Sequence, residues 1–365
     1  MVTDPQHARS VPNLRRLARI STQFAEARTN GSQTVYSLTT LFAGTYFSQQ
    51  FWSKGAPDKK TRATPRLFPH ADKTVHFPEI LKSAGIPTVS YASASWMVNS
   101  VGVIRGLSEE KFVRSRKQTY TLAPDLTRAA VKRIASHGEG PLFLYLHYLD
   151  PHAPCDRGAA RKMKKHPPFN RCLAEIAYVD KHIGRLRRTL EKSGLWERTV
   201  FMISSDHGEA FGEHGNTRHS VSLYDELIHV PLLVRAPQVP ARVVKEPVSL
   251  IDLGPTILDL FGRAPLPQFL GQSLVPFLRG QDPVLTRPII AEGRLKKSWI
   301  FRDGFKLIVD DRVNTTELYD LNSDPKEDHN IFEDHPSAAQ RLGTLRRFFR
   351  VHGIKRRRYK VPFRR

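Results

Sequence analysis

The stretch that decides the fold is Thr199–Gly215, which reads TVFMISSDHGEAFGEHG. Its apolar start, Thr199–Ser204, predicts a buried β-strand. Acidic and imidazole side chains follow the strand at once, at Asp206, His207 and Glu209. Open α/β sheets form their sites just beyond the carboxyl ends of strands. The stretch therefore predicts an α/β protein with a functional site at this edge of the sheet.

The segments on either side extend the same pattern. Leu142–His147 predicts another buried strand, and Ala174–Ser193 predicts a long amphipathic helix that ends at Gly194, a favourable C-cap residue. A further strand is expected at Pro231–Arg235 and a further helix at Ile251–Leu260. Alternating strands and helices of this kind predict a doubly wound, mostly parallel sheet flanked by helices.

Both ends of the chain depart from this alternation. Near the start, the apolar spacing of Asn13–Arg28 predicts one helix, and a second helix is expected to end near Gly44. Past Gly280, short alternating segments and turns predict a small antiparallel unit. We therefore divide the chain into an α/β catalytic domain (1–285), a small C-terminal α+β subdomain (286–351) and a basic tail (352–365).

The charge balance is unusual. The 365 residues carry 57 Lys and Arg against 35 Asp and Glu, a formal net charge of +22. Half of this excess lies in Pro336–Arg365, which has 11 basic residues and no acidic one. Such a tail is typical either of a solvated extension or of a segment that binds an anionic membrane surface. Nucleic acid is the weaker expectation, because no nucleic-acid-binding motif accompanies Lys355–Arg358.

Two cysteines, Cys155 and Cys172, are the only ones in the sequence. Two residues cannot build a disulfide framework or a cysteine-rich zinc site. They can form one disulfide across a basic stretch, Arg157–Lys165, or remain two separate thiols. The sequence leaves both alternatives open.

Three clusters carry residue types that do chemistry. Asp206 and His207 form a plausible pair of ligands for a divalent metal ion, and His219 follows twelve residues later. The plainer alternative is a polar loop with a helix-capping aspartate. His152 lies in a proline-stiffened loop after the strand Leu142–His147, where it is either an anion contact or a simple surface histidine. Thr34 precedes a helix, where a hydroxyl is either an N-cap or a nucleophile.

An ordered series of segments runs along the chain around these clusters. The series comprises Pro12–Leu14 (PNL), Ser37–Gly44 (SLTTLFAG), Asp150–Pro154 (DPHAP), Ser205–Gly215, Leu223–Glu226 (LYDE), Val230–Leu232, Asp252–Gly262 (DLGPTILDLFG), Gly271–Leu274 (GQSL) and Glu317–Leu321 (ELYDL). In its order and extent the series resembles the sulfatase family of the alkaline phosphatase superfamily. The resemblance covers most of the chain and implies hydrolysis of an anionic sulfate or phosphate ester.

The sequence departs from the sulfatase pattern at the nucleophile. Sulfatases carry a cysteine or serine that is oxidised to formylglycine, followed by a proline and an arginine. The matching position here, ten residues before Gly44, is Thr34, and the arginine is absent. A threonine there is similar to the nucleophile of phosphoethanolamine and glycerolphosphate transferases. His219 likewise resembles a phosphate-contacting histidine of those transferases.

A second departure lies at the start of the sequence. The family opens with a buried strand that ends in acidic metal ligands, whereas here no apolar strand precedes Asp4. We therefore expect a missing first strand and a site that lacks one acidic ligand, as in a truncated or degenerate copy. An upstream segment of this kind would place the protein outside the cytoplasm or at a membrane, as the family resemblance suggests.

Together the residues and the resemblance imply a specific site. Asp206, His207 and Thr34 would hold one divalent metal ion (Ca, Mn, Zn or Mg). Thr34 would attack the anionic ester substrate, while His152 and His219 contact its oxygens. The alternatives are a transferase with an alcohol as acceptor, or a non-catalytic member that only binds anions. In each case we expect the five residues to share one pocket.

Overall fold

The computed structural model of the chain describes residues 7–54, 67–112, 120–354 and 359. Asp4 and most of the predicted basic tail (355–358 and 360–365) lie outside these described residues. Within the described ranges, none of the helices has the length and apolar character needed to cross a membrane.

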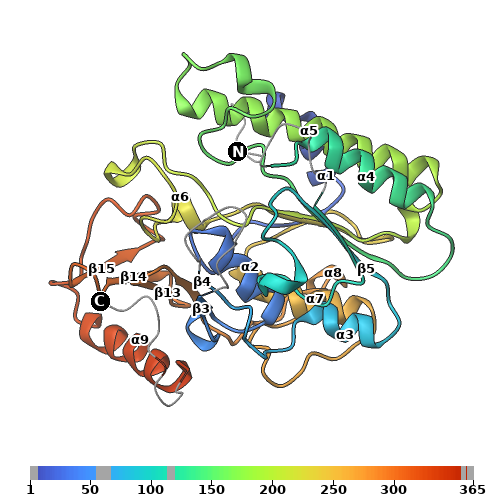
Figure 1. The fold of residues 1–365 in the computed structure, drawn as a ribbon. Helices are drawn as coiled ribbons and strands as arrows, with labels where there is room; N and C mark the ends of the chain where they lie inside the picture. The colour runs from blue at the N-terminus through green and yellow to red at the C-terminus, as the bar shows by residue number, and fades with distance from the viewer. Residues whose placement is uncertain (1–6, 55–66, 113–119, 355–358, 360–365) are drawn as a thin grey trace.

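Two sheets form the body of the protein (Figure 1). In the first sheet, β5 pairs in parallel with both of its neighbours, β6 and β7. In the second, β1 runs parallel to β10, whereas β9 is antiparallel to both β1 and β8. Within the first sheet the strand order is β6 (Glu109–Phe112), β5 (Thr88–Ala92) and β7 (Phe143–His147). Within the second sheet it is β8 (Phe201–Ser204), β9 (Leu232–Arg235), β1 (Thr22–Phe24) and β10 (Arg242–Val244).

Helices cover the strands on both faces (Figure 1). Because successive side chains of a strand point to opposite faces, Leu144 and Leu146 of β7 join one apolar core, while Phe143 and Tyr145 join the other. The doubly wound α/β class expected from the sequence is therefore confirmed. The first core faces α1 (Pro12–Ala18), α4 (Ala123–Ala135) and α5 (Pro168–Lys192); the second faces α2 (Thr34–Ala43), α3 (Phe77–Ser83), α7 (Leu253–Leu260) and α8 (Val275–Leu278).

The two sheets meet without a hydrogen-bonded seam. Within the described residues, β7 pairs with β5 and β8 pairs with β9, and neither has a second strand neighbour. Most side chains of both strands are partly exposed, although their sequences are apolar. The carboxyl ends of β7 and β8 are nonetheless close to each other. This closeness shows in the electrostatic interaction between His147, at the end of β7, and Asp206, just after β8. The predicted site therefore lies beside an open pair of strand edges.

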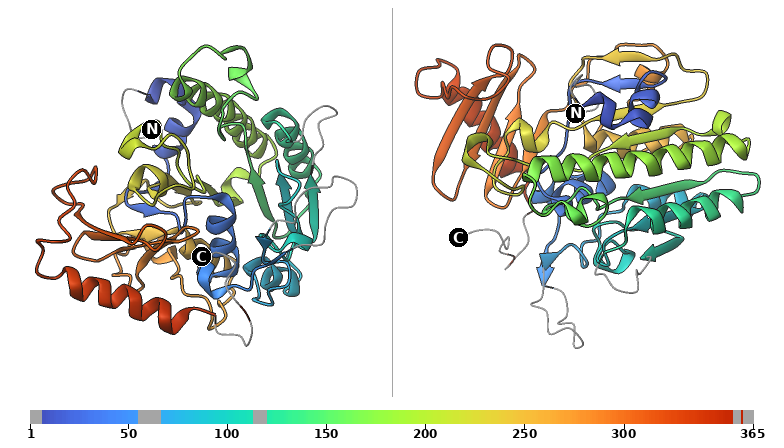
Figure 2. Two further views of the ribbon diagram at one scale, coloured as in Figure 1. Left: turned by 60° about the vertical axis from the view of Figure 1, so that its left-hand side comes forward. Right: turned by 90° about the horizontal axis from the view of Figure 1, so that it is seen from above.

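The C-terminal unit is the expected small antiparallel sheet with a closing helix. Figure 2 shows it standing at one end of the α/β layers. One further short helix and two pairs of short strands complete the described α-helices and strands. The unit contains β12 (Ile289–Glu292), β13 (Lys296–Ile300), β14 (Phe305–Asp310), β15 (Thr315–Asp320) and α9 (Ala338–His352); the further elements are α6 (Asp225–Ile228) and the pairs β2 (Ala27–Arg28) with β11 (Val248–Ser249) and β3 (Ser53–Lys54) with β4 (Leu67–Phe68).

One predicted helix is wrong. The helical spacing of Asn13–Arg28 holds only as far as Ala18, where α1 ends. The next residues form β1, whose backbone pairs with β9 on one side and β10 on the other. Pairing with strands more than 200 residues away in the sequence outweighs the local helical pattern.

A buried charge network joins the α/β layers to the C-terminal sheet. The Lys306 ammonium on β14 is fully buried and lies 2.8 Å from both Asp225 Oδ1 and Glu327 Oε1. Arg28 donates to the other oxygen of Asp225 at 2.7 Å. Burial would raise the pKa of Asp225, but Lys306 and Arg28 hold it well below its ordinary value. The three elements that carry these residues are thereby fixed relative to one another.

We predict that Lys306→Met destabilises the protein by about 3–5 kcal/mol, because it leaves two buried carboxylates without their shared cation. Urea unfolding monitored by circular dichroism measures this loss. The double variant Lys306→Met/Glu327→Gln removes one of the stranded charges and should recover part of the stability. Lys111→Met, at an exposed ion pair with Glu109, serves as the control and should change stability by less than about 1 kcal/mol. An equal effect of the two lysine substitutions would contradict the prediction.

Candidate active site

The structure brings the five predicted residues into one chain of contacts. Thr34 Oγ1 lies 3.2 Å from Nε2 of His207. The His207 ring stacks on that of His219, with 4.5 Å between centroids. His219 in turn meets the His152 ring edge-on at 4.8 Å. Asp206 precedes His207, and Thr34 lies close enough to it to lower the pKa of its carboxyl.

Thr34 is the first residue of α2 and is buried. The preceding residue, Gln33, is extended, so the chain turns into the helix at this point. The N-terminus of a helix carries a partial positive charge and backbone N–H groups without helical partners. This environment favours negative charge on the Thr34 oxygen and on any anion beside it.

The turn that carries Asp206 and His207 depends on Gly208. A Cβ atom at this glycine would lie 2.0 Å from the carbonyl oxygen of Glu226. The Gly208 N–H donates to the carbonyl of Leu227 at 2.8 Å, so the turn lies directly against α6. The glycine in the DHG triplet is therefore required by this close approach of two backbones.

The protons of His207 are fixed by its neighbours. Its Nδ1 lies 2.8 Å from the carbonyl oxygen of Gly208, which can only accept, so Nδ1 carries the hydrogen. In the neutral ring this leaves a lone pair on Nε2, the nitrogen that faces Thr34. A metal-binding histidine typically has this arrangement, with its second nitrogen donating to a backbone carbonyl.

Asp206 contributes a buried carboxylate oxygen. Its Oδ2 atom is inaccessible to solvent and has no hydrogen-bond partner among the described residues. This oxygen lies 3.6 Å from His207 Nε2. Burial would raise the pKa of Asp206, but the charges of His207 and His147 and the hydrogen bond from Thr34 lower it below its ordinary value. The carboxylate is thus ionised and lacks a partner for one of its oxygens.

These donors fit a divalent cation. A carboxylate oxygen, an imidazole nitrogen and a hydroxyl oxygen converge, and such mixed oxygen and nitrogen sets suit Mg, Mn, Ca or Zn ions. In the part of the chain that the structure describes, no cluster of three or more His, Cys, Asp or Glu side chains has metal-binding geometry. Asp4 is outside that part, so the expected lack of an acidic ligand stays a prediction.

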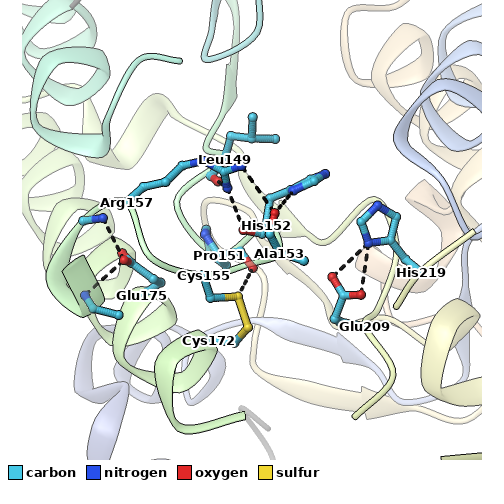
Figure 3. Close-up of a disulfide and its surroundings, with 12 residues drawn as sticks. Leu149, Pro151, His152, Ala153, Cys155, Arg157, Cys172, Glu175, Glu209 and His219 are labelled. Carbon is cyan, nitrogen blue, oxygen red and sulfur yellow. Dashed lines mark hydrogen bonds and ion pairs between the residues drawn. A yellow bond between two sulfur atoms is a disulfide. The ribbon is translucent and has the colours of Figure 1, made fainter. Parts of the chain in front are cut away.

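Glu209 orients His219. Both carboxylate oxygens of Glu209 accept from Nδ1 of His219, at 3.1 and 2.9 Å (Figure 3). Burial would raise the pKa of Glu209, but its hydrogen bond with His219 and the nearby ring charges lower it. His214, the other histidine of this segment, instead stacks on Tyr224 and bonds the carbonyl of Glu327. It joins the segment to the C-terminal sheet rather than to the pocket.

The loop that carries His152 is closed by a disulfide (Figure 3). Cys155 and Cys172 are bonded, with their Cα atoms 4.8 Å apart, so the disulfide alternative is confirmed. Cys172 lies in the first turns of α5, which begins six residues earlier than the sequence suggested. The bridge therefore attaches the end of the His152 loop to a long helix.

One neighbour of the site was missed by the sequence reasoning. His147, the last residue of β7, is buried. It lies close enough to Asp206 and His207 for both residues to shift its pKa. Burial lowers the pKa of His147, Asp206 raises it and His207 lowers it, and the net shift is downward. The sequence feature that could have identified His147 is its place at the end of a predicted strand, because Asp206 was selected for lying just after such a strand.

The fold and this cluster define a class: an α/β protein that gathers a hydroxyl, a carboxylate and three imidazoles at strand and helix ends. Comparison with known families gives the same class. The sulfatase family model matches residues 3–263. A second model, for the C-terminal region of N-sulphoglucosamine sulphohydrolase, matches residues 212–347. The chain belongs to the sulfatase family.

Individual relatives agree with this assignment. The uncharacterized sulfatase YidJ of Escherichia coli K12 is 33% identical over 177 residues, which are 46% of this chain and 34% of that protein. N-acetylglucosamine-6-O-sulfatase of Bacteroides thetaiotaomicron is 34% identical over 174 residues, 44% of this chain and 31% of that protein. The match thus spans about a third of the length of these relatives.

Solved structures share the fold. A 2-O GAG sulfatase superposes with a TM-score of 0.77 at 17% identity, covering 96% of this chain and 89% of that one. The phosphonate monoester hydrolase of Agrobacterium radiobacter gives 0.70 at 18% identity, covering 94% and 91%.

We predict that reducing the disulfide destabilises the protein by about 3 kcal/mol, because the bridge closes a 17-residue interval and restricts the unfolded chain. Urea unfolding with and without dithiothreitol measures the change. The Cys155→Ser/Cys172→Ser variant is the control, since it should match the reduced protein and no longer respond to the reductant. No further cysteine is present in the sequence to complicate the comparison. Equal stability of oxidised and reduced protein would refute the prediction.

Proposed function

We propose that the protein is a metal-dependent hydrolase of sulfate or phosphate esters that uses Thr34 as its nucleophile. The observation that carries this proposal is the position of the Thr34 hydroxyl, at a helix N-terminus and 3.2 Å from His207 Nε2. A hydroxyl between the Asp206 carboxylate and an imidazole lone pair faces two hydrogen-bond acceptors. Its proton therefore points toward them, and an oxygen lone pair remains for attack.

A divalent cation held by Asp206, His207 and Thr34 would lower the pKa of the hydroxyl and offset the charge of the ester. The hydroxyl proton would pass to solvent and Thr34 Oγ1 would attack sulfur or phosphorus in line. The bond to the leaving oxygen would break, and that oxygen would take a proton from water to leave as an alcohol. His219 donates from Nε2 to the ester oxygens when its ring is protonated, because Nδ1 already bonds Glu209. His152 lies beside it and can make the second contact in the same way, donating from Nε2 when its ring is protonated, because its Nδ1 bonds the Ala153 carbonyl. Water completes hydrolysis of the threonine ester.

Transfer to an alcohol is the second candidate. Thr34 and His219 are the two positions where the sequence resembles the phosphoethanolamine and glycerolphosphate transferases more than the sulfatases. The chemistry up to the threonine ester is the same in both cases. The acceptor that releases this ester, water or an alcohol, distinguishes them.

We predict that Thr34→Ala lowers ester hydrolysis at least about a thousandfold, because no other group can form the covalent intermediate. Aryl sulfate, aryl phosphomonoester and phosphodiester substrates are assayed with Mg, Mn, Ca and Zn ions, with and without added alcohol. Intact-protein mass spectrometry detects the ester on Thr34. Ser32→Ala, which removes a buried hydroxyl two residues away, is the control and should keep its activity.

Two outcomes would contradict the proposal. Full activity of Thr34→Ala would exclude this residue as nucleophile. A wild-type protein that binds sulfate but hydrolyses none of these esters, whichever metal is supplied, would favour the non-catalytic, anion-binding alternative.

A basic excursion beside the site favours substrates with several negative charges. One relative of known structure, with a TM-score of 0.73 at 16% identity, was solved with D-glucosamine-2-N,6-O-disulfate as its substrate. Here the segment between the bridged cysteines carries exposed cations, and none has an ion-pair partner in the described ranges. Phe169, near the end of the same segment, packs against Phe211 of the site loop. The exposed cations are Arg161, Lys162, Lys164 and Lys165.

We predict that Lys164→Ser/Lys165→Ser weakens binding of dextran sulfate at least about tenfold at low salt, because two phosphate-like contacts are lost. Hydrolysis of a small aryl ester, which reaches only the pocket, should not change. Lys181→Ser/Lys192→Ser, on the exposed face of α5, is the matched control. If dextran sulfate binding stays intact, the excursion is not the polyanion contact. Binding of anionic partners, such as a membrane surface, would then be assigned to the basic tail.

A further inference from the structure

Arg157 makes an unusual set of contacts. Its guanidinium donates to three backbone carbonyls of the loop that carries His152: those of Leu149 at 3.4 Å, His152 at 2.6 Å and Ala153 at 3.3 Å. In the described part of the chain it pairs with no carboxylate. Its planar face instead lies over the Tyr120 ring, 4.7 Å from the centroid. Both terminal nitrogens of the guanidinium thus bond the same turn.

The carbonyl of Ala153 also receives His152. Nδ1 of that ring lies 2.7 Å from the carbonyl oxygen (Figure 3). Because a carbonyl oxygen only accepts, Nδ1 must carry the hydrogen in this contact. The oxygen has two lone pairs, one for the His152 ring and one for Arg157. In the neutral ring the lone pair then lies on Nε2, on the side away from the loop.

Arg157 is itself held from both sides. Cys155 before it is bonded to Cys172 on α5. After it, the N–H groups of residues 158, 159 and 160 all donate to the buried carboxylate of Glu175, one turn further along α5, at 2.7, 3.1 and 3.0 Å. These two anchors fix the backbone on each side of Arg157. Cys155 also reaches the turn, since its N–H donates to the His152 carbonyl at 3.0 Å. Of the contacts from this anchored segment, only those of the guanidinium reach the carbonyls of Leu149 and Ala153, the second of which is the partner of the His152 ring.

We propose that Arg157 is a positioning residue for His152: by bonding the carbonyls of residues 149, 152 and 153 it fixes the ring in the tautomer that has hydrogen on Nδ1 and leaves Nε2 toward the pocket. Without the guanidinium, the Ala153 carbonyl is free to rotate toward other donors. The ring then exchanges between tautomers and orientations. Lysine carries its three N–H donors on one nitrogen, so it can replace part of this set but not the planar spread of a guanidinium.

The tautomer can be read directly. Long-range ¹H–¹⁵N spectra of the full chain, labelled at histidine, distinguish protonated from unprotonated ring nitrogens, and the spectrum of His152→Gln assigns the signals. We expect hydrogen on Nδ1 in the wild type, a mixture of tautomers in Arg157→Met and an intermediate state in Arg157→Lys. Arg128→Met, which removes an exposed arginine paired with Asp125, is the control and should give the wild-type spectrum.

A kinetic readout accompanies the spectra and rests on the proposed function. We expect Arg157→Met to lower kcat about 10–100-fold with little change in KM, and Arg157→Lys to recover part of the loss. A wild-type ring with hydrogen on Nε2, or an unchanged tautomer in both Arg157 variants, would overturn the proposal. A tautomer shift in a protein that hydrolyses no ester would instead refute the proposed function and leave the positioning role standing.

Discussion

The position of the site depends on one buried ion, the ammonium of Lys306. It holds Asp225 and Glu327 together, and the second oxygen of Glu327 accepts the N–H of Asp225 at the start of α6. The backbone of α6 in turn supports the turn at Gly208 that carries Asp206 and His207. The C-terminal sheet therefore does more than extend the fold, because its lysine fixes the helix against which this turn is built.

Local patterns in the sequence predicted most of the architecture. The strand that precedes Asp206 and the helix that follows Thr34 were visible because apolar periodicity and a C-cap glycine at Gly44 act within a few residues. The resemblance to sulfatases then placed Thr34 ten residues before that glycine, and the structure puts it beside His207. The proximity of these residues follows from the topology of the sheet, which the alternation of strands and helices in the sequence indicates. The chemical roles of these residues remain predictions.

Long-range partners could not be predicted. The β1 segment has helical spacing and became a strand through pairing with β9 and β10, which its own residues do not indicate. Arg157 looked like one charge in a basic run, and its carbonyl contacts arise from a loop closed by the disulfide. His147 carried the same strand-end signal as Asp206, but a histidine inside an apolar run is more often a core residue. In each case the deciding contact depends on the folded chain.

Charge determines which ligands this pocket can accept. A buried, ionised carboxylate with an unpartnered oxygen is costly, and a bound cation removes that cost. With a cation in place, the neighbourhood of Thr34 contains that ion, the N-terminus of α2 and the rings of His152 and His219, with Glu209 as the opposing charge. The remaining favourable occupant is an anion. Cation and anionic ester should therefore bind with mutual support, because each offsets the charge that makes the other unfavourable alone.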